Sequence, residues 1–383
     1  MSSPAAQSSK EPTAQSELPP TASSSSSQIT ENRSPHSSGS TTAEDLSAWS
    51  KFFNRHAQLG RNRRHRNESD HKESMRKLRR LVLNRVPDDD LHTPFGPSRP
   101  LVWKLLLGVD CSATHYLDLV ARGPSPAHVK IRNDTFRTLA TDQGFKERVS
   151  EEMLIRLLEA FVWRSMDMYE DDAEASMEED APLSFSYVQG MNVLAAPFLY
   201  VYSAQSATLT STSLSDPAAK GKQRKIGSEM EAFYCFAAFI ERCCPLYVQP
   251  TLVGVHAGLE LLDRCLNIAD PSLFAHLRSK NLTAELYAFP SVLTLCACTA
   301  PLSEVLHLWD FLLAFGVHLN ILCVVAQLLL MRDQLMDSAS PMKLLRSFPP
   351  IKARAIIGIT TTLVRDLPDE IYQELVAHTG AML

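Results

Sequence analysis

Hydrophobic residues recur with a helical period along most of the chain. One apolar stripe, with the spacing of a single helix face, contains Leu302, Val305, Leu306, Trp309, Leu312 and Leu313. The segments from Glu151 to Trp163 and from Glu229 to Ile240 are rich in helix-forming residues. Period-two alternation and glycine-based hairpin turns are nearly absent. The pattern predicts an all-α domain from about residue 72 to about residue 380, without internal repeats.

The N-terminal segment has a different composition. Residues 1–50 are mostly Ser, Thr, Pro, Ala, Gln and Glu, with few large apolar side chains. Such a segment buries too little apolar surface to offset its ordering entropy, so we predict a disordered tail. It also lacks the apolar core of a signal peptide. The longest apolar stretch, Ile321 to Met331, is interrupted by Gln327 and is too short for a membrane span, so we expect a cytoplasmic protein.

The charge distribution identifies a basic lead-in at residues 51–71. The whole chain has a formal net charge of -5, which argues against a nucleic-acid binder. The stretch from Arg61 to Arg80, however, contains nine Lys or Arg residues and only three acidic residues. This stretch could contact an acidic partner or a membrane surface. We favour the alternative, a solvated start of an amphipathic helix whose inner face carries Met75, Leu78 and Val82.

Two segments interrupt the helical pattern. Residues 167–180 carry eight carboxylates and no basic residue, and residues 203–228 are rich in Ser and Thr and end in four basic residues. Uncompensated charge does not fit a core, so we predict two surface insertions. The eight cysteines include no two CxxC pairs. We therefore expect small buried hydrophobic residues there rather than metal ligands.

Arg137 and Gln189 are the candidates for chemistry. Asp134 lies three residues before Arg137, a spacing that on a helix lets a carboxylate hold a guanidinium. Gln189 precedes Gly190 at the start of an apolar run, where the glycine allows a partner's backbone to approach. The alternatives are an ordinary surface ion pair and a glutamine that caps a helix. A fixed arginine with a fixed glutamine suits charge stabilisation and water positioning at a phosphoryl group, and neither residue does covalent chemistry. The pair therefore suggests a protein that completes another protein's nucleotide site.

Three motifs, in this order, resemble the TBC domain of the Rab-GAP type. They are Arg99-Pro100-Leu101-Val102-Trp103 with the residues up to Gly108, Ile131-x-x-Asp134-x-x-Arg137-Thr138, and Tyr187-x-Gln189-Gly190-Met191. Segments at 231–236, 270–273 and 308–310 resemble the family's C-terminal half. The likeness covers roughly residues 72–335, and we expect residues 336–383 to be a helical extension packed on that domain.

The resemblance implies a two-lobed helical domain that stimulates GTP hydrolysis by small Ras-like GTPases. Arg137 would be the arginine finger, Gln189 would orient the attacking water, and Asp134 would orient Arg137. Arg99 and Trp103 would support the packing of the catalytic lobe. Tyr187 and Gly190 would shape the glutamine segment. The domain would carry no cofactor of its own, because the partner GTPase brings GTP and Mg²⁺.

Residues 285–291 and 305–311 resemble most closely the fungal mitotic-checkpoint branch of the family. Most members have a tryptophan near the position of Pro290, and its absence here favours this branch over a Rab-directed activator. The branch implies negative regulation of mitotic exit or septation, a location at the spindle pole body, and a non-catalytic partner subunit.

Two other functions compete with GTPase activation. The chain could be a scaffold that binds a GTPase or checkpoint partner without stimulating hydrolysis. A helical adaptor unrelated to GTPases would require three ordered motif matches by accident. Trp309 and Asp310 illustrate that a motif can be structural. We expect Trp309 to be buried and Asp310 to accept a hydrogen bond from a neighbouring helix or loop.

Overall fold

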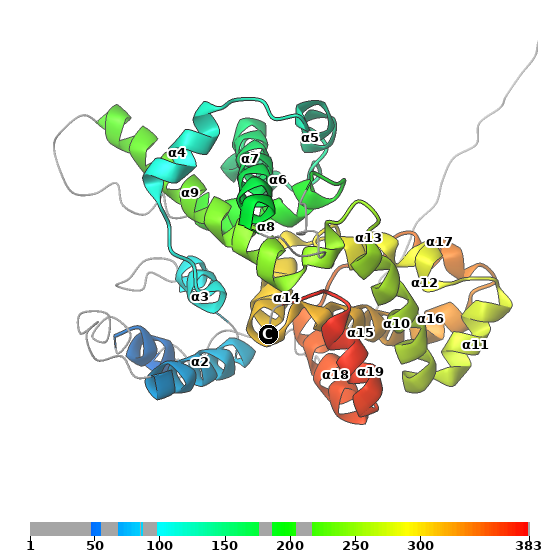
Figure 1. Cartoon of the computed structure of the whole chain (residues 1–383). Helices are drawn as coiled ribbons and strands as arrows, with labels where there is room; N and C mark the ends of the chain where they lie inside the picture. Colours follow the sequence, from blue (N-terminus) through cyan, green and yellow to red (C-terminus); the bar gives the residue numbers. More distant parts are fainter. Residues whose placement is uncertain are drawn as a thin grey trace, which may run out of the picture. The chain divides into compact units, whose positions relative to one another are not determined.

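The computed structural model describes residues 47–54, 68–84, 86, 98–175, 186–203 and 217–381. These residues form helices joined by turns, with no strand among them (Figure 1). The predicted all-α class is therefore confirmed. Helices α3 to α9 pack mainly on one another, and so do α10 to α19. Helix α14 contacts α2 and α3 as well as α18, so it joins the two groups.

The first group surrounds α8 (Met191–Ser203), which contacts α3, α5, α6, α7 and α9. Ten of its thirteen residues are buried, as expected for a helix that is apolar on all sides. The helices around it are α3 (Ser98–Leu107), α4 (Ala113–Ala121), α5 (His128–Thr135), α6 (Gln143–Arg148), α7 (Glu151–Ala175) and α9 (Pro217–Cys243).

The second group is built on α10 (Val253–Ala269) and α15 (Asn320–Leu330), which pack on each other. Helix α18 lies on α14 and α15, and α19 lies on α10. The remaining elements are η3 (Pro245–Tyr247), α11 (Pro271–Ser279), α12 (Ala284–Tyr287), α13 (Phe289–Leu293), α14 (Leu302–Phe315), η4 (Val317–Leu319), α16 (Arg332–Asp337), α17 (Pro341–Leu345), α18 (Ala353–Asp366) and α19 (Asp369–Ala377).

Helix α14 is more enclosed than its apolar stripe predicts. Five of the six stripe residues are buried and Leu313 is partly buried. His307, Leu308, Asp310 and Phe311, on the other faces, are buried as well. Helices α2, α3 and α18 all pack on α14, so residues outside the stripe are buried as well.

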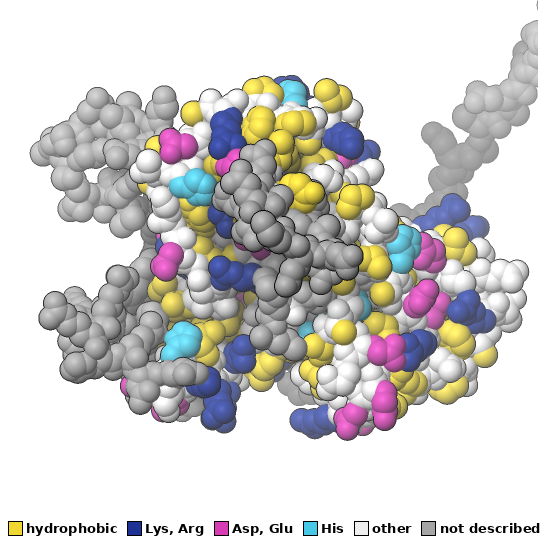
Figure 2. Space-filling view, viewed as in Figure 1, with side chains coloured by type: hydrophobic (Ala, Val, Ile, Leu, Met, Phe, Trp, Pro, Cys, Tyr) yellow, Lys and Arg dark blue, Asp and Glu magenta, His cyan; other side chains and the backbone are white. Residues whose placement is uncertain are grey.

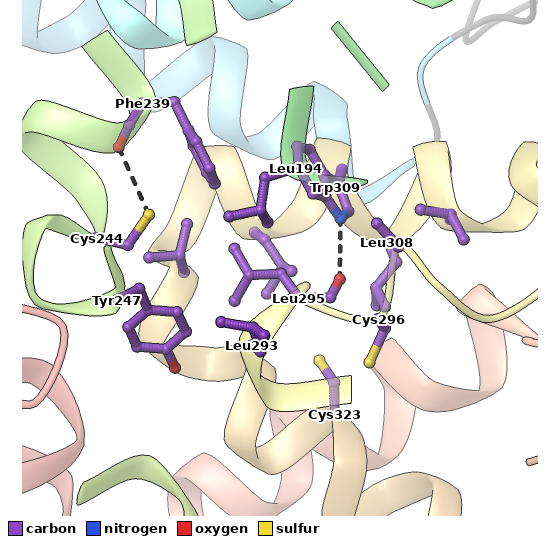
Figure 3. Close-up of a cluster of buried hydrophobic side chains, with 14 of the residues drawn as sticks. Leu194, Phe239, Cys244, Tyr247, Leu293, Leu295, Cys296, Leu308, Trp309 and Cys323 are labelled. Carbon is purple, nitrogen blue, oxygen red and sulfur yellow. Dashed lines mark hydrogen bonds between the residues drawn. The ribbon is translucent and has the colours of Figure 1, made fainter. Parts of the chain in front are cut away.

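Trp309 lies at the centre of the apolar core. Its side chain is among those of Leu194, Phe239 and Leu295, which come from α8, α9 and the turn after α13 (Figure 3). The indole Nε1 donates a hydrogen bond of 2.9 Å to the carbonyl of Leu295. The predicted burial of Trp309 is confirmed, at 1% exposure.

The N-terminal region contains more structure than its composition predicts. Residues 47–54 are helical, and Trp49, Phe52 and Phe53 are buried. The Trp49 and Phe53 rings stack with their centroids 5.6 Å apart. The predicted boundary of the tail at residue 50 therefore falls inside a helix, while residues 1–46 lie outside the described residues.

Helix α2 (Glu68–Leu83) packs on α14 with the inner face that the sequence predicts. Leu78 and Val82 are buried, and Met75 is partly buried. The amphipathic-helix interpretation is confirmed for this part of the basic stretch. Residues 55–67 lie outside the described residues.

Both predicted insertions are partly helical. Helix α7 continues to Ala175 and α9 begins at Pro217, so residues 167–175 and 217–228 extend core helices. Glu in the first segment and Lys in the second favour helix formation. Residues 176–185 and 204–216 lie outside the described residues.

Candidate functional site

Arg137 lies in the turn that follows α5, two residues after the helix ends at Thr135. The helix on which the sequence analysis considered this spacing therefore contains Asp134 but ends before Arg137. Its backbone amide nevertheless donates to the carbonyl of Asp134 at 3.4 Å, so the turn keeps the i, i+3 geometry. The guanidinium Nη2 donates to Asp134 Oδ1. The Arg137 side chain is 53% exposed while that of Asp134 is 8% exposed, so a buried carboxylate holds a guanidinium that solvent can reach.

The second oxygen of Asp134 binds the glutamine segment. Tyr187 Oη donates a hydrogen bond of 2.9 Å to Asp134 Oδ2, across 53 positions of sequence. Burial, and then the charge of Asp134, raise the pKa of Tyr187 far above its ordinary value, so the phenol remains a donor at neutral pH. One carboxylate therefore connects the two predicted site segments.

Asn192 makes a second connection that the sequence analysis did not identify. Its Nδ2 donates to Thr138 Oγ1 at 2.8 Å and to the carbonyl of Asp134 at 3.3 Å, and its Oδ1 accepts from the amide of Gly190 at 3.2 Å. A buried amide needs such partners. The sequence could have indicated this role, because Asn192 is a polar residue in the first turn of the otherwise apolar helix α8.

Gln189 and Gly190 form the turn that precedes α8. Gly190 has φ +108°, and a Cβ there would lie 2.9 Å from Leu293 Cδ2, so a side chain would be strained and crowded. Gln189 is exposed, and none of its polar atoms is hydrogen-bonded to another described residue. The amide of Gly190 donates to Asn192, so Gln189 does not cap that amide. The side chain of Gln189 is therefore available to a partner.

Arg99 and Trp103 lie inside the molecule. From α3, Arg99 Nε donates to both oxygens of Asp310 at 3.1 Å and Trp103 Nε1 donates to Asp310 Oδ1 at 2.7 Å. The Arg99 and Asp310 side chains are 3% and 2% exposed. The predicted acceptor role of Asp310 is confirmed. These contacts join α3 to α14 and place none of the three residues on the surface.

The surface beside Arg137 is apolar and basic. Val129 and Phe136, seven positions apart on α5 and the turn after it, are 70% and 67% exposed. Lys130 and Arg132 are exposed between them. Figure 2 shows hydrophobic and basic side chains together where Figure 1 places α5. These four exposed side chains all lie within eight residues of Arg137 in the sequence.

Metal ligands and thiols give no further candidate site among the described residues. No group of three or more His, Cys, Asp or Glu side chains within them could hold a metal ion. All eight cysteines are free, and only Cys298 is exposed. Burial raises the pKa of Cys235 to about 12 and that of Cys243 to about 11, so these thiols are not nucleophiles at neutral pH. No helix in the described part of the chain has the length and apolar content of a membrane span.

Comparison with known proteins identifies the family. Residues 97–336 match the Rab-GTPase-TBC domain, so the chain belongs to the TBC family. The crystal structure of the Ypt/Rab-GAP domain of Gyp1p has the same fold, with a TM-score of 0.57 at 18% identity, and the match covers 79% of this chain and 93% of that one.

Two relatives in yeasts are more similar in sequence. Cell division control protein 16 of Schizosaccharomyces pombe is 44% identical over 299 residues, which cover 78% of this chain and 85% of that protein. Mitotic check point protein BUB2 of Saccharomyces cerevisiae is 38% identical over 309 residues, which cover 80% of this chain and 92% of that protein. Helix α2 and residues 47–54 lie outside the residues that match the family domain.

Proposed function

We propose that this chain stimulates GTP hydrolysis by a small Ras-like GTPase, with Arg137 and Gln189 supplied in trans. The observation that carries the proposal is the bridge through Asp134, whose two oxygens bind Arg137 and the Tyr187 of the glutamine segment. This bridge holds the two segments together while leaving the guanidinium half exposed and the amide exposed. Membership of the TBC family supports the same reaction class.

The chemistry follows from the two side chains. An arginine offered to the β- and γ-phosphates stabilises the charge of the transition state, and this is worth on the order of 10³ to 10⁵ in rate. The amide of Gln189 would orient the attacking water. The GTPase would bring the nucleotide and Mg²⁺, so this chain needs no cofactor of its own. The buried polar contacts behind Asp134 pre-organise the arginine before the partner arrives.

We also propose a role in a mitotic checkpoint, as a negative regulator of mitotic exit or septation. The names of the two yeast relatives support this role. A non-catalytic partner subunit and a location at the spindle pole body rest on the resemblance to the fungal branch alone. The competing function, a scaffold that binds a GTPase without activating it, would leave Arg137 and Gln189 without a chemical task.

Single-turnover GTP hydrolysis by a panel of mitotic Ras-like GTPases separates activator from scaffold. We expect the chain to accelerate hydrolysis by at least one of them, and Arg137→Lys to lose nearly all of that acceleration because an ammonium lacks the planar fork. Binding of the GTPase should persist in the variant. A lysine variant as active as the parent would favour the scaffold.

A further inference from the structure

Helix α5 ends two residues before Arg137, and no side chain of its own N-cap residue caps its N-terminus. Its N-cap residue Ala127 provides no side-chain hydrogen bond, and its first turn contains no acidic residue. Instead, Glu159 of α7 approaches this end. Its Oε2 accepts from the amide of Ser125 at 2.6 Å, and its Oε1 is 2.6 Å from His128 Nδ1. The Glu159 side chain is 8% exposed, and a buried carboxylate of this kind is costly unless it is fully bonded.

The other end of α5 is also held by α7. Thr135 Oγ1 donates to Glu151 Oε1 at 3.1 Å. Glu151 and Glu159 are eight residues apart, about 12 Å along a helix, and His128 and Thr135 are seven apart, about 10.5 Å. The two acidic residues of α7 therefore match the length of α5 and fix its position along α7. A free helix as short as α5 would be marginal without such contacts.

We propose that Glu159 is a positioning residue for Arg137, an inference that rests on the proposed function. Arg137 takes its orientation from Asp134, Asp134 lies on α5, and Glu159 fixes the N-terminal end of that helix. Among the described residues, its carboxylate bonds Ser125, three residues before α5, and His128, the first residue of α5. Loss of the Glu159 contacts would shift the Arg137 guanidinium relative to the phosphates of the bound nucleotide, while Arg137 itself would remain. A displacement of about 1 Å is enough to cost roughly 10²-fold in rate.

The first test compares Glu159→Gln with Glu229→Gln in single-turnover hydrolysis. Glu229 is the matched control because it is equally buried in the same group of helices but bonds Arg156 and Tyr116, which lie outside α5. We expect Glu159→Gln to lower the maximal stimulated rate roughly 10-fold or more, with little change in half-saturation by the GTPase. Glu229→Gln should lower the melting temperature without this loss of rate. Equal rate losses in the two variants would overturn the assignment.

The second test asks whether Glu159 acts through Arg137. Glu159→Gln should add no further loss to Arg137→Ala, while it should still reduce the residual rate of Gln189→Ala. Full additivity with Arg137→Ala would overturn the positioning role while leaving the proposed function intact. A parent chain that activates no GTPase would instead overturn the proposed function, and this assignment with it.

A milder variant covers the case in which Glu159→Gln fails to fold. His128→Asn removes only the contact to Oε1, and the His128 side chain is 33% exposed. We expect a several-fold loss of maximal rate that again disappears in the Arg137→Ala background. A rate equal to that of the parent would show that the Glu159 contact with α5 does not position Arg137.

Discussion

The molecule contains two arginine–aspartate pairs built to the same plan. In each, the aspartate holds a guanidinium and accepts a further hydrogen bond from an aromatic side chain: Trp103 at Asp310 and Tyr187 at Asp134. They differ in exposure, since Arg99 is 3% exposed and Arg137 is 53% exposed. The first pair joins α3 to α14 inside the protein. The second presents its arginine to solvent.

The comparison shows that burial, not the identity of the partners, separates a structural pair from a candidate site. A buried guanidinium that satisfies all its hydrogen bonds inside the protein has nothing left for a ligand. A half-exposed guanidinium on a buried aspartate is oriented and still accessible. Changes at the first pair should therefore appear in the free energy of unfolding, and changes at the second in the rate of stimulated hydrolysis.

The largest expected effect on stability is at Arg99. Arg99→Ala leaves the charge of Asp310 buried and unpaired, so we expect a loss of about 3–5 kcal/mol in the free energy of unfolding. Urea unfolding followed by circular dichroism measures it. Arg137→Ala should change the same quantity by about 1 kcal/mol or less, because its guanidinium is half exposed and Asp134 keeps the hydrogen bond from Tyr187. Equal losses in the two variants would break the comparison.

Buried histidines should make stability depend on pH. Burial lowers the pKa of His318 and of His378 to about 4. In the unfolded chain both regain a pKa of about 6.5, so below that value the unfolded state binds more protons. Their stabilising effect is therefore complete above about pH 6.5 and is lost as the pH falls toward 4. Between pH 7 and 5 we expect a loss of about 1–2 kcal/mol per histidine.

The matched control for this pH dependence is Arg137→Ala. Because Arg137 lies in the turn after α5 and not beside the histidines, its removal should leave the slope of unfolding free energy against pH as in the parent. His378→Gln should reduce that slope. An unchanged slope in the histidine variant would mean that His378 is not a buried neutral group.

Phe136 tests the surface beside the exposed pair. Phe136→Ala should weaken binding of the GTPase about tenfold, because an exposed aromatic ring next to Arg137 in the chain suits an anchor of the proposed interface. Stability should hardly change, since the side chain is already 67% exposed. Titration of a fluorescent GTPase provides the affinity. Leu330→Ala, which removes an exposed leucine on α15, is the control, and an equal loss in both variants would contradict this placement.

A substitution at Tyr187 should have small effects on both the free energy of unfolding and the rate of stimulated hydrolysis. Tyr187→Phe removes one donor from Asp134, so we expect a loss of about 0.5–1.5 kcal/mol in unfolding free energy. The stimulated rate should fall several-fold because Asp134 then orients Arg137 less well. A variant that matches the parent in both measurements would show that the bridge through Asp134 contributes nothing.

The helical class and the segments around Arg137 and Gln189 could be predicted because they depend on local pattern. The contacts of Asn192 and Glu159 could not, because their partners lie tens of residues away and only the packing of α5, α7 and α8 brings them together. The predicted boundary at residue 50 divided the helically spaced Trp49, Phe52 and Phe53, because the low apolar content of the preceding residues outweighed one tryptophan. Burial also separates Arg99 from Arg137, a difference that the sequence analysis obtained only from the family resemblance.

The most direct test of the central claim uses a GTPase whose own catalytic glutamine has been replaced. If Arg137 and Gln189 act together in trans, the parent chain should still stimulate single-turnover hydrolysis by this GTPase. Arg137→Lys and Gln189→Ala should each abolish most of the stimulation while leaving the melting temperature unchanged. Stimulation that requires the GTPase's own glutamine and ignores Gln189 would contradict the account.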